Sequence, residues 1–121
     1  MERTSQILVS GQAVAFLNFA NFTDTPSALK AIEHARQFIA RSPPKSVKTL
    51  TDVTGSRANN EIIDALKGLA KANKPYVKAG AVVGLTPLQR VIYSAVMAFS
   101  GRNLSAFATL DEAKAWLVKQ P

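Results

Sequence analysis

The residues best suited to chemistry are hydroxyl, carboxylate and guanidinium side chains that gather in two short segments. Those that we identify as candidate ligand-binding or partner-binding residues are Asp52, Thr54, Gly55, Ser56, Arg57, Thr86 and Arg90. A glycine lets the backbone approach a ligand, the start of a helix offers free amides, and a guanidinium pairs with an anion. The two segments therefore predict a small site for a phosphate or a carboxylate.

The same residues also have a simpler role as helix caps. Neither a Gly-x-Gly-x-x-Gly nor a Walker pattern accompanies them. Hydroxyl and amide side chains accept hydrogen bonds from the first amides of a helix and stabilise it by about 1 kcal/mol. The residues that could do so here are Thr54, Ser56, Asn59 and Thr86. Helix capping is the favoured interpretation, and ligand binding is the alternative.

Groups for catalysis or metal binding are scarce. The sequence has no cysteine and one histidine, His34, which lacks a second histidine for a metal site and a Gly-x-Ser-x-Gly element for a triad. Among the carboxylates, Glu61 and Asp64 are better explained by helix solvation than by acid–base chemistry. We therefore predict no catalytic residue, no metal, no cofactor and no enzyme activity. Hydrolysis or phosphoryl transfer through Asp52 and Arg57 is the remaining enzymatic alternative.

The spacing of apolar residues predicts five strands and four helices. Strands are expected at 7–9, 13–19, 47–53, 76–84 and 104–108, and helices at 26–41, 59–73, 87–100 and from 110 onward. Thr86 with Gln89, and Thr109 with Glu112, have the spacing of capping boxes. The order β-β-α-β-α-β-α-β-α predicts an α/β fold with a mostly parallel sheet and right-handed crossovers.

The composition is that of a single packed domain spanning residues 1–121. Hydrophobic residues form 47% of the chain and charged residues 19%. The net charge is +7, but the basic residues are scattered and not interleaved with aromatics, so a nucleic-acid partner is not expected. The first apolar run, Ile7–Val9, is too short for a signal peptide, which favours a cytoplasmic location.

The helix expected at 87–100 is unusually apolar. No charged residue lies between Arg90 and Arg102, and apolar side chains cover more than one face of the helix. This stretch is too short to span a bilayer, which takes about 20 residues. Neighbouring helices that cover it fully are one explanation, and a homodimer partner, a lipid chain or a membrane surface are the others. The predicted interface residues are Val91, Ala95, Val96 and Phe99.

Four segments carry a resemblance to a known family. They are Thr51–Gly55, Lys74–Gly84, Phe99–Asn103 and Leu110–Leu117. Together with the order of the elements, these segments resemble the SpoIIAA-like family of bacterial proteins. The resemblance extends over roughly residues 45 to 119, and before that only the element order agrees.

The resemblance implies a STAS-like fold, which the family shares with anti-sigma-factor antagonists and sulfate transporters, and a kinship of fold with lipid-carrying Sec14-type domains. In the antagonists a kinase phosphorylates the first serine of an Asp-Ser-Ser-Gly motif. The matching residues here are Asp52, Val53, Thr54 and Gly55, so the phosphoacceptor position holds a valine. Thr54 and Ser56 remain candidate phosphoacceptors, since the start of a helix favours a phosphate.

Two functions from different classes follow from these patterns. The first is a non-catalytic regulatory or protein-interaction module of STAS type, which binds another protein or a second copy of itself. The alternative is a carrier or sensor of a small amphiphile or anionic ligand, such as a lipid or a nucleotide. The helix at 87–100 and the segment around Thr54 are the surfaces on which both hypotheses depend.

Overall fold

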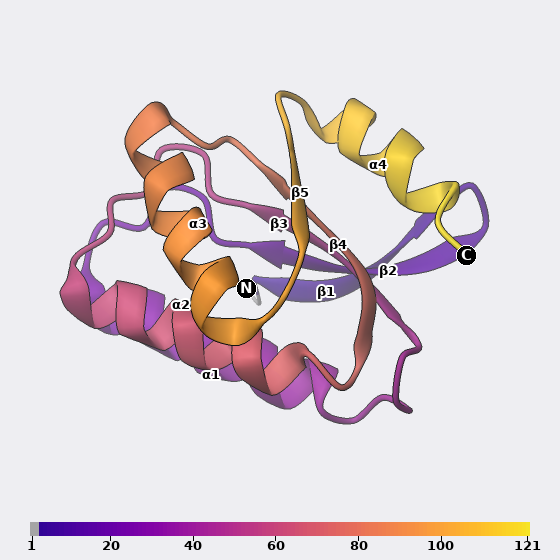
Figure 1. Ribbon diagram of the computed structural model, residues 1–121, viewed down its shortest axis with the longest axis horizontal. Coiled ribbons are helices and arrows are strands. Elements are labelled where there is room, and N and C mark those ends of the chain that lie inside the picture. Colours follow the sequence, from indigo (N-terminus) through magenta and orange to yellow (C-terminus); the bar gives the residue numbers. More distant parts are fainter. Residues whose placement is uncertain (1–2) are drawn as a thin grey trace.

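The computed structural model describes residues 3–121, and its elements follow the expected order (Figure 1). The strands are β1 (Thr4–Val9), β2 (Gln12–Asn18), β3 (Val47–Asp52), β4 (Val77–Val83) and β5 (Leu104–Phe107). The helices are α1 (Thr25–Ile39), α2 (Asn60–Asn73), α3 (Pro87–Ser100) and α4 (Leu110–Val118). No helix within these residues is both long enough and apolar enough to cross a membrane.

The strands form one sheet in the order β1-β2-β3-β4-β5. β1 is antiparallel to β2, and every other neighbouring pair is parallel, which confirms the expected α/β fold with a mostly parallel sheet. The β1–β2 hairpin closes on a two-residue loop in which Ser10 has φ 50° and Gly11 has φ 78°. Two left-handed residues suit the twist of a tight hairpin, and β1 therefore forms an edge of the sheet.

The helices divide unequally between the two faces of the sheet (Figure 1). Each right-handed crossover from β2 to β5 adds its strand on the same side, and this places α1, α2 and α3 on one face. The main core lies beneath them and includes Leu17, Ile32 and Leu69. α4 covers the other face, where Ala113 and Leu117 pack on Leu50 and Ala81 and their neighbours. Both faces of the sheet are thus covered, which explains the apolar runs in β2 and β4.

The helix boundaries follow from their caps. Thr86 and Gln89 form the expected capping box at the start of α3, and Gly101 ends that helix with φ 71°. The box expected at Thr109 forms only in half. The Thr109 hydroxyl accepts from the amide of Glu112, but the Glu112 carboxylate accepts from that hydroxyl and not from the backbone. The prediction of a complete capping box at the start of α4 is therefore wrong.

α4 is fastened to the sheet by a buried lysine. Lys48 on β3 is 5% exposed, and its Nζ donates to the carbonyls of Leu117 at 2.8 Å and Gln120 at 2.7 Å, and to Oε1 of Gln12 at 2.7 Å. An ammonium at the C-terminal end of a helix satisfies its last carbonyls and complements its dipole. Burial, with a smaller effect from Lys78, lowers the pKa of Lys48 from its ordinary value.

Candidate functional site

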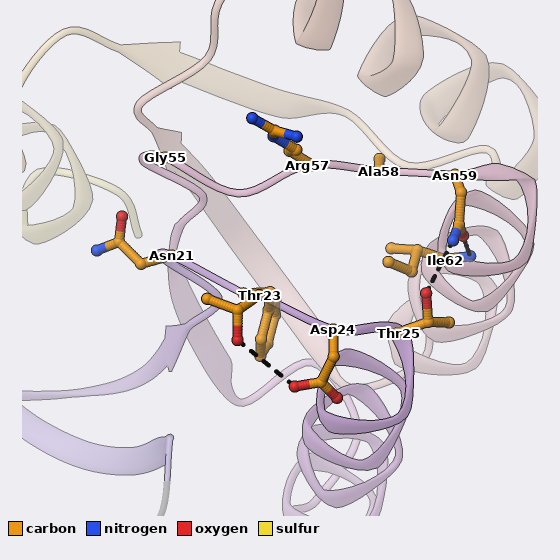
Figure 2. A pocket seen from close by; sticks show the side chains of 10 residues that line it. Asn21, Thr23, Asp24, Thr25, Gly55, Arg57, Ala58, Asn59 and Ile62 are labelled. Atoms are coloured by element: carbon orange, nitrogen blue, oxygen red, sulfur yellow. Dashed lines mark hydrogen bonds between the residues drawn. The ribbon is translucent and has the colours of Figure 1, made fainter.

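The loops that follow β2 and β3 enclose an open pocket at the edge of the sheet where the parallel strands end (Figure 2). Its volume is about 440 Å³, and its walls come from residues 21–25 and 55–59 together with Ile62. Asp24 and Arg57 lie on opposite walls. The junctions after β2 and β3 therefore meet at this pocket, which brings together Gly55 and Arg57 of the candidate residues.

Hydrogen bonds between the two loops give this pocket its shape. The Ser56 hydroxyl donates to the carbonyl of Phe19 and accepts from the amide of Phe22 at 3.0 Å. Gly55 has φ +72°, and a Cβ on it would lie 2.1 Å from Oδ1 of Asn21. The glycine and the serine hydroxyl therefore serve the contact between the loops, which leaves Ser56 without a free hydroxyl hydrogen for a ligand.

The two helix N-termini at the pocket are capped by side chains of the chain itself. Oδ1 of Asp24 accepts from the amide of Ser27 at 2.8 Å, and Oδ1 of Asn59 accepts from the amide of Ile62 at 2.9 Å. The bonds from the Ser27 amide and hydroxyl hold the pKa of Asp24 below its ordinary value, so a negative charge already lies at the start of α1. This arrangement supports the capping interpretation over a bound anion.

Thr54 lies outside the pocket in a turn of its own. Oδ1 of Asp52 accepts from the Thr54 hydroxyl at 2.6 Å and from the Thr54 amide at 3.0 Å, and Thr54 is exposed. α2 begins at Asn60 behind its cap Asn59. The prediction that Thr54 and Ser56 lie at the start of this helix is therefore wrong, because the loop after β3 continues to Asn59. Phosphorylation of Thr54 or Ser56 stays a prediction.

The third junction reaches Arg57 through Gln89, which lines a small cavity of about 30 Å³ with Ser56 and Arg57. Thr86 is occupied as the cap of α3, and Gln89 donates from Nε2 to the carbonyl of Ser56 at 2.7 Å. Arg90 lines a separate cavity between α3 and the sheet. The prediction that Thr86 and Arg90 share one pocket with Arg57 is therefore wrong, because the side chain of Gln89 joins the loops and the rest of α3 turns away.

α3 has two apolar faces with opposite exposure. On the outer face Leu88 is 71%, Val91 68% and Phe99 56% exposed, and Ala95 is exposed beside them. We call Leu88, Val91, Ala95 and Phe99 the outer face of α3. Val96 is 1% exposed and belongs to the inner face, so its place among the predicted interface residues is wrong. Because both sides of the helix are apolar, the sequence pattern does not indicate which side faces the core.

Tyr93 and Arg102 lie under α3 and were not among the predicted site residues. Tyr93 is buried, and its hydroxyl has no hydrogen-bond partner within residues 3–121. Arg102 follows α3, and burial lowers the pKa of its guanidinium to about 10. The one signal in the sequence was Gly80 inside a predicted strand, since a strand glycine often marks a close approach by another group.

Among residues 3–121 no group of three or more His, Asp or Glu residues is placed to hold a metal ion.

Comparison with known proteins identifies no family for this chain. No protein-family model matches the sequence, and neither the search of curated proteins nor that of solved structures found a match, so the resemblance to the SpoIIAA-like family stays a prediction.

Proposed function

We propose that this protein is a non-catalytic interaction module that binds through the outer face of α3, and that a second copy of the chain is the partner this face fits best. The observation that carries the proposal is the exposure of three large apolar side chains on one helix face, at 71%, 68% and 56%. Large apolar residues that line up on an exposed surface mark interaction sites more often than isolated ones do.

The spacing on α3 suits an antiparallel pair of helices. A twofold axis beside Ala95 places Val91 of one copy against Phe99 of the other, because both lie four residues from the axis. Ala95 and the exposed Ala98 are small, so the two helix backbones can approach closely at the centre of the contact. The face is therefore complementary to itself.

The charges around this face are compatible with the pairing. Nζ of Lys67 and Nζ of Lys71 each lie 5.6 Å from the ring centroid of Phe99. In an antiparallel pair these lysines lie at opposite ends of the contact and do not face each other. The ammonium groups over the ring also leave its other side for an apolar neighbour.

The test is the oligomeric state of the wild type and of Ala95→Glu by analytical ultracentrifugation over a range of protein concentrations. We expect a concentration-dependent dimer for the wild type. Ala95→Glu should weaken it by at least about 100-fold, since two carboxylates would face each other at the twofold axis, away from the lysines at the ends of the contact.

Leu8→Glu is the matched control, because Leu8 is 73% exposed on the edge strand β1 and the substitution changes the charge equally. It should dimerise like the wild type. A wild type that stays monomeric at the highest concentrations, or an equal effect of both substitutions, would contradict pairing through α3.

The alternative of a sensor for an anionic ligand at the pocket beside Arg57 has less support. Asp24 contributes a negative charge to that pocket, and Asp24 and Asn59 already occupy the helix amides that an anion would use. Asp52, the carboxylate considered for catalysis, accepts two hydrogen bonds from Thr54. These contacts are why the proposal favours binding through α3.

A further inference from the structure

The inner side of α3 covers two cavities that share a wall. One, of about 30 Å³, is lined by five polar side chains, Thr49, Thr51, Asn73, Tyr93 and Arg102, and otherwise by apolar residues. The other, of about 100 Å³, has Leu85, Met97 and Ala106 in its lining, and Arg90 and Ser94, both exposed, show that it reaches the surface. Val82, Tyr93 and Leu104 line both cavities.

The guanidinium of Arg102 extends over the sheet at Gly80. A Cβ on Gly80 would lie 2.6 Å from Cδ2 of Leu104, 2.9 Å from Nη2 of Arg102 and 3.0 Å from Oγ1 of Thr49. Gly80 does not have a positive φ, so its backbone does not demand a glycine. The absent side chain instead makes room for Leu104 and for the guanidinium, which is the kind of close approach that glycine permits inside a strand.

This guanidinium lacks a carboxylate partner. The ion pair observed within residues 3–121 joins Arg36 and Glu33, far along the sequence on α1. Burial alone accounts for the lowered pKa of Arg102, and a value of about 10 still leaves the group charged at neutral pH. Arg102 is half-buried, and a charge partly removed from water without a counter-charge still costs free energy, so the site favours a bound anion.

The same cavity holds one buried neutral donor without a partner among residues 3–121, the hydroxyl of Tyr93. Tyr93 is 7% exposed, and its hydroxyl is fully buried without a hydrogen-bond partner in the described part of the chain. Asn73, 2% exposed, adds an amide to the same cavity. A buried hydroxyl without a partner loses free energy that a ligand oxygen would restore.

We propose that these two cavities form a binding site for a small monocarboxylate, whose carboxylate pairs with Arg102 and the Tyr93 hydroxyl and whose short apolar body lies beneath α3. Arg102 is the one cation inside the site, since Arg90 lies exposed at its mouth, and one inner cation with a neutral donor matches a single negative charge. The apolar walls match an aliphatic body, and a cavity of about 100 Å³ restricts it to less than the benzene that a cavity of about 150 Å³ admits. The site is on the opposite side of α3 from its outer face, so the inference does not depend on the proposed dimer.

The experiment is a titration of the ¹⁵N-labelled full chain with butanoate at constant ionic strength, followed by NMR. We expect saturable shifts of the Nε–H of Arg102 and of the amides of Gly80 and Leu104. Butylammonium and 1-butanol, which have the same apolar body without the negative charge, should leave these signals in place. Chloride tests for binding by an inorganic anion.

Three substitutions locate the binding. Arg102→Met should weaken butanoate by about 10- to 100-fold, because it removes charged hydrogen bonds. Gly80→Ala should weaken it by at least about tenfold without a change of charge, since the new methyl group meets both Leu104, which lines the two cavities, and the guanidinium. Arg41→Met alters the charge equally at an exposed position on the surface and should bind like the wild type.

Several results would overturn the inference. Absence of saturation by butanoate, equal binding of chloride, or unchanged affinity in Arg102→Met would each exclude this carboxylate site. A loss of binding in Arg90→Met alone would place the anion at the mouth of the outer cavity instead. The dispersion of the amide signals shows in the same spectra whether each variant is folded, and Gly80→Ala provides a second test if Arg102→Met is not.

Discussion

At the scale of single residues, the hydroxyl of Tyr93 affects the stability of the protein. The phenol lies in the core under α3, and burial raises its pKa well above the ordinary value of 10. The free energy of unfolding includes the cost of keeping a polar group there without a hydrogen bond in the described residues. The residue should therefore influence stability both at neutral and at alkaline pH.

We predict that Tyr93→Phe raises the free energy of unfolding at pH 7 by about 1 kcal/mol, because it removes a buried hydroxyl without a partner. Above pH 10 the unfolded chain releases the phenol proton while the folded chain retains it, so the wild type loses stability as the pH rises. Tyr93→Phe should lose less stability than the wild type over the same rise in pH. Urea denaturation at several pH values measures both effects.

Tyr76→Phe is the matched control for this prediction, because Tyr76 is only half-buried. It should remain within about 0.5 kcal/mol of the wild type at pH 7. If Tyr93→Phe has the same alkaline profile as the wild type, the phenol is reached by solvent and the description of the core under α3 is wrong.

Single residues were the hardest feature to predict from the sequence. Val91 and Val96 both belong to apolar stripes of α3, and no local pattern indicates which stripe faces the sheet. Arg102 and Lys48 look like surface residues because their burial depends on segments far away in the chain. The polar residues around Asp52 were easier to find, yet most of them serve the contact between two loops.

At the scale of elements, a single lysine makes the buried polar contact between α4 and the sheet. We predict that Lys48→Met lowers the free energy of unfolding by about 2 kcal/mol, because it removes the charged donor from which the carbonyls of Leu117 and Gln120 accept. Amide exchange in α4 should become faster than exchange in α1. Denaturation and hydrogen exchange followed by NMR measure the two effects.

Lys78→Met is the control, since Lys78 is an exposed lysine on the neighbouring strand β4. Its stability should stay within about 0.5 kcal/mol of the wild type. Equal losses in the two variants would indicate a general effect of charge and would contradict the role of Lys48 in holding α4.

The elements themselves were predictable because their limits are set locally. Asp24, Asn59 and Thr86 cap their helices, and prolines and glycines separate the segments. The order of the strands and the position of α4 on the far face were not predicted. They result from packing between segments far apart in the chain, and the periodicity within one segment does not indicate how distant segments pack.

At the scale of the whole molecule, the charge of +7 opposes any pairing of two copies. Salt reduces the range of this repulsion from about 30 Å at 0.01 M to about 3 Å at 1 M. We therefore predict that the proposed dimer becomes several-fold tighter as sodium chloride is raised. Ultracentrifugation at a series of salt concentrations measures the change.

The direction of the salt effect separates two kinds of partner. An acidic protein bound to the same face would dissociate as salt is raised, because opposite charges are screened. A dimer that weakens in high salt would therefore contradict a contact dominated by apolar side chains, and it would point to an electrostatic contact instead.

The consecutive order of the strands also bears on how the chain is made. Every strand pairs with the one synthesised just before it, so the sheet and the three helices on its first face can assemble in step with translation. The second face has to wait, since Lys48 meets Leu117 only after another 69 residues. Of the elements in this domain, the last to leave the ribosome is thus the one that shields Leu50 and Ala81 from water.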